Sequence, residues 1–255
     1  MKILITNDDG INTLGIKLLA EWAKKLGDVT VVAPKVEQSG KSQAIEFVQP
    51  VEIKKVPFVE GVTAYSMAST PADCIRFGTA GLHEKYDLVL SGINRGVNLG
   101  ADIVYSGTVG AIFEASRLGF KCIAFSAYPD GQEDAAKYFD EVYDFIVENK
   151  LFDTCNLFNV NIPHKAKGIR MTYQGSEYFS DRFIKAEGAD MYLQEGDQIP
   201  DVCPNDLDRD TVALEAGYIS VTPLLTTRTD MAAFEKLKSN NKAIKQCKIK
   251  RNGAL

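Results

Sequence analysis

The 255-residue sequence is poor in the residues that several kinds of catalytic site require. It contains two histidines, His83 and His164, and neither lies in the polar loops described below, which disfavours a histidine-nucleophile phosphatase and a Ser-His-Asp hydrolase. Five cysteines form no CxxC pair, as is typical of reduced thiols rather than of a zinc site or a disulfide framework. No GxxxxGK[ST] motif is present, so phosphoryl transfer on a P-loop is also disfavoured.

The sequence also lacks excess positive charge and long apolar runs. Its formal net charge is −5, which disfavours attraction to the phosphates of a polynucleotide. No apolar run approaches the roughly 20 residues of a membrane-spanning helix, and the apolar stretch at residues 1–6 is too short for a signal peptide. We therefore expect a cytoplasmic protein with no membrane partner and no polynucleotide partner.

What the sequence does contain is an alternation of strand-like and helix-like patterns. This alternation predicts an α/β fold with a Rossmann-like, mostly parallel sheet and helices on both faces. Short runs at 44–48, 51–56 and 62–65 predict an antiparallel excursion at the sheet edge. The predicted strands of the main sheet are 2–6, 29–33, 87–90, 121–126 and 217–223, and the predicted helices are 15–26, 109–118 and 133–149.

The pattern changes in the last third of the chain. We predict a Rossmann-like catalytic core at residues 1–165 and a smaller C-terminal portion at 166–255 that serves in oligomerisation. The irregular stretch 168–205 predicts an extended hairpin, and the basic stretch 236–251 predicts a solvated terminal helix and tail.

The strongest chemical signal follows the first predicted strand, where Asp8, Asp9 and Gly10 stand in sequence. In parallel sheets, ligands bind outside the carboxyl ends of the strands. Two adjacent carboxylates repel each other there, and a cation would neutralise them. The alternative is a polar turn that caps the next helix.

Three further polar loops follow predicted strands or precede a helix. Ser39 lies after the second strand, and Asn94 and Asn98 lie in a glycine-rich loop after the strand at 87–90. Ser106, Gly107 and Thr108 precede a helix, where hydroxyls and free amides form an anion site, although Ser106 or Thr108 could instead be an ordinary helix cap.

Together the four loops predict one cleft with two ligands. A divalent cation would be held by Asp8, Asp9, Ser39 and Asn94, and a phosphate by Asn98, Ser106, Gly107 and Thr108. Ligands that are all oxygen favour Mg²⁺ or Mn²⁺, one per subunit, over zinc.

These motifs resemble the SurE family of stationary-phase survival proteins, which act as 5'-nucleotidases. The resemblance covers residues 1 to about 225. It implies a metal-dependent phosphomonoesterase that acts on nucleoside 5'-monophosphates, and in some members on 3'-monophosphates and short polyphosphate, in a homodimer or homotetramer. The residues that carry it are Ile5–Ile11, Val32–Pro34, Ser39–Gly40, Thr70–Cys74, Ser91–Gly100, Tyr105–Gly110, Asn159–Pro163 and Gly217–Leu224.

The mechanism that we predict is attack on phosphorus by a metal-bound water, with Asp8 or Asp9 as the proton acceptor and Asp8 the preferred candidate. Three alternatives stay open. The first is an aspartyl-phosphate enzyme with Asp8 as nucleophile, which Gly10 disfavours because that fold needs a second Asp at this position. The second is a nucleotide sensor without turnover, and the third is polynucleotide binding by residues 236–251.

Overall fold

The computed structural model describes residues 1–188 and 190–241. Contacts divide the chain into a compact unit Met1–Leu225 and a second unit Thr226–Leu255. The second unit contains helix α7 (Met231–Leu237) and a short 3₁₀ helix (Lys238–Asn240). The terminal helix predicted within 236–251 therefore starts earlier than expected, and residues 242–251 of that prediction lie outside the described residues.

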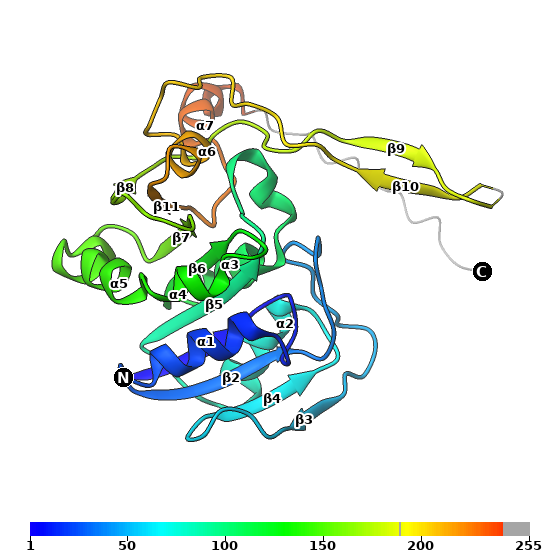
Figure 1. Ribbon diagram of the computed structural model, residues 1–255, viewed down its shortest axis with the longest axis vertical. Helices are drawn as coiled ribbons and strands as arrows, with labels where there is room; N and C mark the ends of the chain where they lie inside the picture. Colours follow the sequence, from blue (N-terminus) through cyan, green and yellow to red (C-terminus); the bar gives the residue numbers. More distant parts are fainter. Residues whose placement is uncertain (189, 242–255) are drawn as a thin grey trace, which may run out of the picture. The chain divides into compact units, whose positions relative to one another are not determined.

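In the described part of the chain, nine strands form one sheet in the order β3-β4-β2-β1-β5-β6-β7-β11-β8 (Figure 1). The six strands from β4 to β7 are parallel to their neighbours, whereas β3 and β11 each run antiparallel to the strand beside them, β4 and β7 respectively. The predicted α/β fold with a mostly parallel sheet is confirmed. The strands are β1 (Lys2–Thr6), β2 (Asp28–Pro34), β3 (Ile53–Lys55), β4 (Thr63–Met67), β5 (Leu88–Arg95), β6 (Lys121–Ala127), β7 (Leu157–Ile162), β8 (Ile169–Met171) and β11 (Ile219–Pro223).

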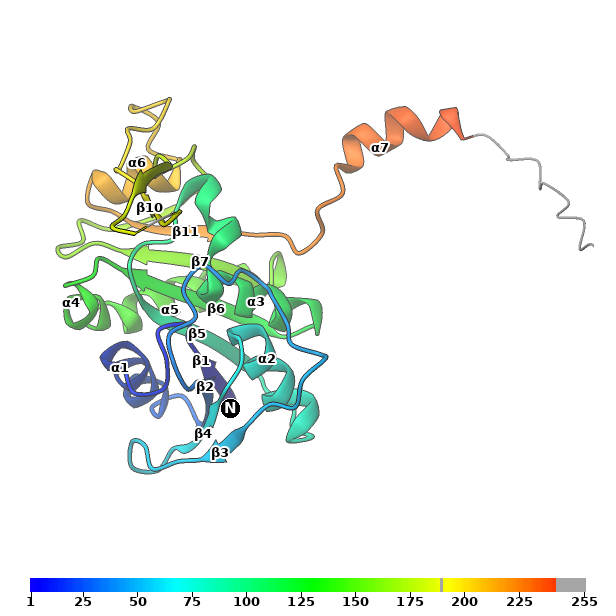
Figure 2. The ribbon, with the colours of Figure 1, turned by 90° about the vertical axis from the view of Figure 1, so that its right-hand side faces the viewer.

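Helices cover both faces of the sheet, as predicted. Side chains that alternate along β1 show why: Ile3 and Ile5 enter one apolar cluster and Leu4 enters the other, so both faces need a cover. In Figure 2, α1, α4 and α5 lie on one side of the sheet and α2 and α3 on the other. The bounds are α1 (Leu14–Ala23), α2 (Pro71–Arg76), α3 (Gly107–Arg117), α4 (Gln132–Ala136) and α5 (Phe139–Glu148).

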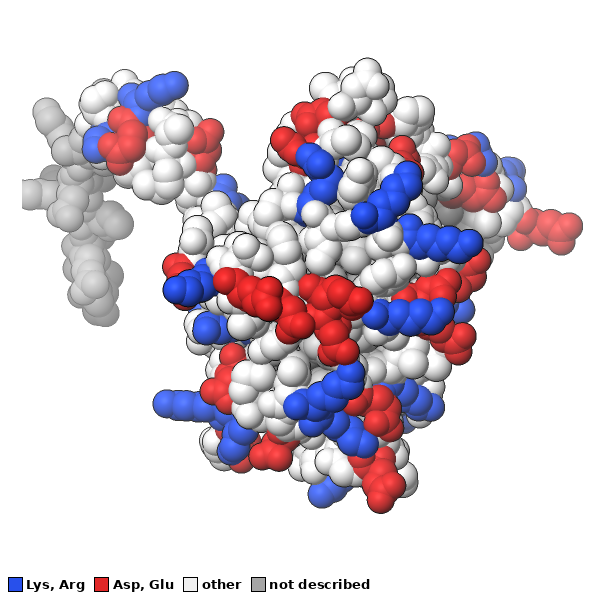
Figure 3. All heavy atoms as spheres, turned by 60° about the vertical axis from the view of Figure 1, so that its left-hand side comes forward, with Lys and Arg blue, Asp and Glu red and all other residues white. Residues whose placement is uncertain are grey.

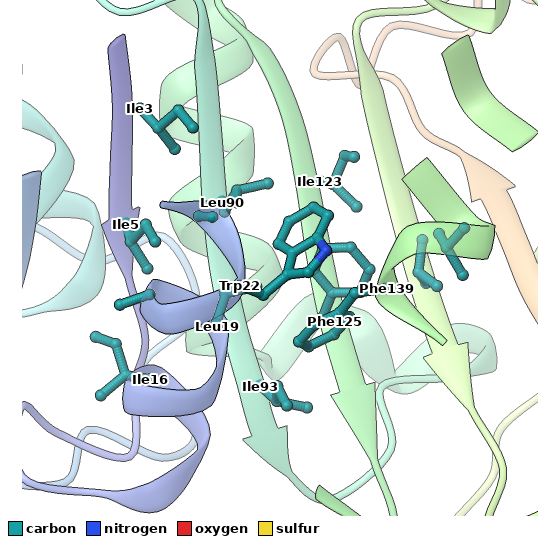
Figure 4. Packing of buried hydrophobic residues seen from close by; sticks show 14 of the residues in the cluster. Ile3, Ile5, Ile16, Leu19, Trp22, Leu90, Ile93, Ile123, Phe125 and Phe139 are labelled. Carbon is teal, nitrogen blue, oxygen red and sulfur yellow. The ribbon is translucent and has the colours of Figure 1, made fainter. Parts of the chain in front are cut away.

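The aromatic centre of the larger cluster joins α1 to β6 and α5. The Trp22 ring lies 6.3 Å from that of Phe125 and 5.2 Å from that of Phe139, centroid to centroid (Figure 4). Its indole N–H donates to Asp140 Oδ1 at 2.7 Å, so the polar atom of this large side chain is satisfied at the edge of the core. This packing holds α1, the helix that follows the turn with Asp8 and Asp9, against the sheet.

Three local predictions are wrong. The helix expected at 133–149 is two helices, α4 and α5, because the chain turns at Tyr138, whose hydroxyl accepts a hydrogen bond from Ala166 N at 3.1 Å. The strand expected at 44–48 does not form, since side chains satisfy its backbone: Asp73 Oδ2 accepts from Glu46 N, and Glu46 Oε1 accepts from Val48 N. Strand β5 runs on to Arg95, so Asn94 lies in a strand and not in a loop.

The extended hairpin predicted within 168–205 is confirmed. Strands β9 (Arg182–Lys185) and β10 (Tyr192–Glu195) pair antiparallel and extend away from the main sheet (Figure 1). Strands β8 and β11 also come from residues after 165, yet they complete the main sheet. The division of the chain at residue 165 remains a prediction.

The surface carries charges of both signs. In the face shown in Figure 3, Lys and Arg side chains are interspersed with Asp and Glu. Among the described residues, no helix has the length and apolar character needed to cross a membrane.

Candidate metal and phosphate site

The order of the strands reverses at β1. From β1 the chain proceeds outward through β2 to β4, and then crosses back to place β5 on the other side of β1. In such sheets the crevice beyond the carboxyl ends of the two strands at the reversal is where ligands bind. Asp8 and Asp9 follow β1 directly, and Asn94 lies near the end of β5, so both predicted carboxylates and the predicted amide reach this crevice.

A hydrogen-bonded turn fixes the segment that carries the two carboxylates. The Asn7 side chain accepts from Gly10 N at 3.2 Å and donates to Gly10 O and to Thr13 Oγ1, both at 3.0 Å. Gly10 has φ of +106°, a conformation that other residues rarely adopt, and its carbonyl also accepts from Thr13 Oγ1. The turn thus defines where Asp8 and Asp9 lie.

Asp8 is buried against the first turn of α3. Its side chain is 4% exposed, and its Oδ1 accepts from Thr108 Oγ1 at 2.5 Å while Oδ2 accepts from Thr108 N at 3.1 Å. A Cβ atom at Gly107 would lie 2.9 Å from Asp8 Oδ2, so only glycine permits this close approach. Burial raises the pKa of Asp8, and the two bonds from Thr108 offset only part of that rise.

Asp9 is held from β5. Its Oδ2 accepts from Arg95 N at 3.0 Å. Burial, and then the negative charge of Asp8, raise the pKa of Asp9 to about 6. Two neighbouring carboxylates that are both costly to ionise form a site that a bound cation would stabilise.

Ser39 approaches from the loop after β2, and it brings a residue that the sequence argument missed. Ser39 Oγ donates to Glu37 Oε1 at 2.6 Å, and Gln38 N donates to Asp8 O at 2.7 Å, which fastens this loop to the Asp8 turn. The charge of Glu37 contributes to the raised pKa of both Asp8 and Asp9. An acidic residue two positions before Ser39 was the signal that could have revealed it.

The amides of Asn94 and Asn98 are both oriented by neighbours. Asn94 Nδ2 donates to Gly96 O at 2.8 Å, which leaves its amide oxygen to accept. Asn98 is held more completely: its Nδ2 donates to Ser126 Oγ, its backbone N donates to Asn161 Oδ1, and its carbonyl accepts from Asn159 and Asn161, all at 2.8 Å. The sequence argument noted Asn159 and Asn161 as a motif and assigned them no role.

The start of α3 is shared between capping and contact with Asp8. Ser106 Oγ accepts from Val109 N at 3.0 Å, so the interpretation of Ser106 as a helix cap is correct for its hydroxyl. Thr108 uses both its N–H and its hydroxyl on Asp8. The first-turn amides of an α-helix have no intrahelical acceptor, and the helix dipole there favours an anion.

A cavity of about 540 Å³ brings most of the predicted residues together. Asp8, Asp9, Ser39, Asn94, Asn98 and Ser106 line it, whereas Gly107 and Thr108, which contact Asp8, do not. The lining also includes residues that the sequence argument did not select, several of them aromatic, and we call this group the far end of the cavity. These are Val97, Leu99, Asp102, Tyr105, Tyr178, Phe179, Asp181 and Gln194.

The fold and the cavity define an α/β protein with an acidic cleft at the strand reversal of its sheet. The family model described as "Survival protein SurE" matches residues 3–181. The chain belongs to the SurE family.

Individual relatives match along nearly their whole length. A protein of Caldanaerobacter subterraneus named 5'-nucleotidase SurE is 38% identical, over 93% of this chain and 96% of the relative. One of Acinetobacter baumannii with the same name is also 38% identical, over 94% and 99%. The crystal structure of the SurE protein from Aquifex aeolicus superposes with a TM-score of 0.79 at 33% identity, over 94% of this chain and 99% of that one.

Proposed function

We propose that this protein is a metal-dependent 5'-nucleotidase that hydrolyses nucleoside monophosphates to nucleoside and phosphate. The observation that carries the proposal is a pair of adjacent carboxylates in one cavity beside the start of α3, of which Asp8 is buried and Asp9 half-buried. The relatives named 5'-nucleotidase SurE support the same activity. We extend it to 3'-monophosphates and short polyphosphate as further substrates to be tested.

The residues present suit a hard divalent cation. Among the described residues, no group of three or more His, Cys, Asp or Glu side chains forms a metal site, so the cation would depend on two carboxylates and on neutral oxygens. Asp8 and Asp9 would supply the carboxylates, and Ser39 and Asn94 the neutral oxygens. Such oxygen ligation suits Mg²⁺ or Mn²⁺, and one ion per subunit would supply Lewis-acid polarisation of the phosphate and an acidified water.

The phosphate would lie between the cation ligands and the start of α3. Asn98 and Ser106 would donate to its oxygens, because the amide of Asn98 and the hydroxyl of Ser106 are donors that need no reorganisation. We do not assign Gly107 a contact with phosphate, because it does not line the cavity. Thr108 would act through Asp8, whose carboxylate it holds.

Two carboxylates compete for the role of proton acceptor. Asp8 remains the residue that we predict from the sequence. Its two oxygens already accept hydrogen bonds from Thr108, whereas Asp9 accepts through Oδ2 alone among the described residues, which makes Asp9 the competing candidate. A pH–rate profile of Thr108→Val separates them: an acidic limb that moves identifies Asp8, and an unchanged limb identifies Asp9.

The test of the proposed function is phosphate release from a panel of nucleoside 5'- and 3'-monophosphates and tripolyphosphate. Each is assayed with Mn²⁺, with Mg²⁺ and with excess chelator. We expect release from the 5'-monophosphates that stops in chelator. Nucleotide binding without release under all conditions would replace this proposal with a nucleotide sensor.

We also propose a homodimer or homotetramer in which the β9–β10 hairpin makes contact. Its apolar side chains support this: Phe183 is 67% exposed and Leu193 is 53% exposed. Light scattering after size exclusion tests the mass. The cytoplasmic location and the lack of a polynucleotide partner remain predictions.

A further inference from the structure

A further buried carboxylate lies near the cleft but belongs to a different part of the chain. Asp210, the first residue of α6 (Asp210–Glu215), is 0% exposed. It accepts hydrogen bonds from Gly175 N at 2.7 Å, from its neighbour Thr211 N at 2.8 Å and from Gly100 N at 3.1 Å. One carboxylate therefore joins the base of the hairpin, helix α6 and the segment that follows Asn98.

The peptide of Gly100 is held on every side. Gln174 Nε2 donates to its carbonyl at 2.8 Å, and Ala101 N donates to Ser176 O at 3.1 Å. A Cβ atom at Gly100 would lie 1.8 Å from Ser176 O, so no other residue fits. Gly100 begins the 3₁₀ helix η2 (Gly100–Tyr105), which leads directly to Ser106, and it follows Asn98 by two positions.

The same segment forms the wall of the cavity. Asp102 Oδ2 accepts from Tyr178 N at 2.8 Å and from Phe179 N at 2.9 Å, and all three residues line the cavity with Asn98 and Tyr105. Displacement of Gly100 would therefore move the residues on both sides of it that face the ligand.

We propose that Asp210 is a positioning residue for the nucleotide: by holding Gly100 it sets the place of Asn98 and of η2 in the cleft. This rests on the proposed function. A carboxylate suits the position because it only accepts hydrogen bonds, and three backbone N–H groups donate to it. The side-chain amide of an Asn would point its own NH₂ group at one of these N–H groups. Asp210 contacts neither Asp8 nor Asp9, so its effect is expected on substrate and not on the cation.

Asp210→Asn tests the proposal, and Asp201→Asn is the matched control. Asp201 is also buried. It accepts from Ser176 N, Cys203 N and Thr211 Oγ1 at 2.6–3.0 Å and pairs with Arg209 Nε at 2.7 Å, and none of these partners lies within residues 96–106. We expect Asp210→Asn to raise KM for a nucleoside monophosphate about tenfold with kcat changed less than about threefold, because the displaced cavity wall, with Asp102 and Tyr105, would bind the ground state and the transition state alike. The Kd for Mn²⁺, measured by titration calorimetry without nucleotide, stays that of the wild type.

Hydrogen exchange supplies a readout that does not depend on activity. In Asp210→Asn, amides within 96–106 lose protection, whereas in Asp201→Asn they keep it. Gln174→Ala removes the hydrogen bond to the carbonyl of Gly100, and we expect it to raise KM about threefold. This variant replaces Asp210→Asn in the test if Asp210→Asn does not fold.

An unchanged KM in Asp210→Asn, or an equal rise in Asp201→Asn, overturns the positioning role. If the wild type releases no phosphate under any condition, the proposed function fails, and hydrogen exchange alone then tests the role of Asp210. Selective loss of protection at residues 96–106 in Asp210→Asn supports the contact between Asp210 and Gly100 as a positioning contact, and unchanged protection overturns it.

Discussion

The two ends of the cavity are built differently. At the acidic end, Asp8 is almost fully buried, and the turn that bears it is closed by bonds among Asn7, Gly10 and Thr13. At the far end, Tyr105 is 62% exposed and Phe179 is 45% exposed, and both belong to irregular or 3₁₀ segments. The contrast teaches that the groups expected to do chemistry rest on the rigid sheet, while those expected to recognise the rest of the substrate rest on surface segments.

Removal of one acidic ligand should give the largest effect. For Asp9→Asn we expect kcat/KM with Mn²⁺ to fall about 10³-fold or more, because a carboxylate that holds the cation is lost. Initial rates over a range of Mn²⁺ concentrations measure it. Full activity at every metal concentration would remove Asp9 from the proposed site.

A change behind the acidic end should have a smaller effect. Thr108→Val removes the hydroxyl that donates to Asp8, and we expect a loss of about 10- to 100-fold in kcat/KM, as for other residues that orient a metal ligand. Thr79→Val is the control, because the Thr79 hydroxyl is buried and donates to Ile75 O away from the cleft. Equal activity loss in the two variants would reduce the role of Thr108 to general packing.

The far end should affect recognition alone. We expect Phe179→Ala to raise KM for a nucleoside monophosphate about tenfold, since stacking of a base on an aromatic ring contributes about 1–3 kcal/mol. The rate with p-nitrophenyl phosphate, which has no base, should not change. Phe183→Ala, on the hairpin and outside the cavity lining, is the control, and a matching rise in its KM would contradict the assignment.

The smallest effect concerns stability of the acidic end without metal. The pKa of Asp9 is raised to about 6, so the folded state holds this proton more tightly than the unfolded state. The free energy of unfolding therefore falls as the pH rises from about 4 to about 6 and stays lower above that range. In excess chelator at pH 7.5 we expect Asp9→Asn to be more stable than the wild type, by about 1–2 kcal/mol after solvent screening.

Urea unfolding at several pH values checks this difference, which should shrink toward pH 4. Added Mn²⁺ should stabilise the wild type and leave the variant unchanged. A wild type that is the more stable protein in chelator at pH 7.5 would show that the carboxylate pair carries no such penalty.

The comparison also separates what a sequence can reveal from what it cannot. The acidic turn could be predicted because Asp8, Asp9 and Gly10 stand together shortly after an apolar run. The sheet could be predicted from the spacing of such runs. Glu37 could have been selected from its position two residues before Ser39, but Asp210 could not be predicted as a site residue, since it acquires its role from contacts made only after folding. The break at Tyr138 escaped for the same reason: the apolar period continues through it, and the bond to Ala166 that accompanies the turn comes from a distant segment.

The bond between Asp8 and Thr108 joins residues 100 positions apart, and that between Asn98 and Asn161 joins residues 63 positions apart. A chain made from its N-terminus thus has its carboxylate pair early, but Asn98 gains its direct partners on β7 only after that strand has left the ribosome and entered the sheet, and the bond from Gly100 to Asp210 forms later still. Ribosome-bound chains that end before residue 157 should therefore neither bind nor hydrolyse nucleotide. Activity should appear only late in synthesis and in a single step.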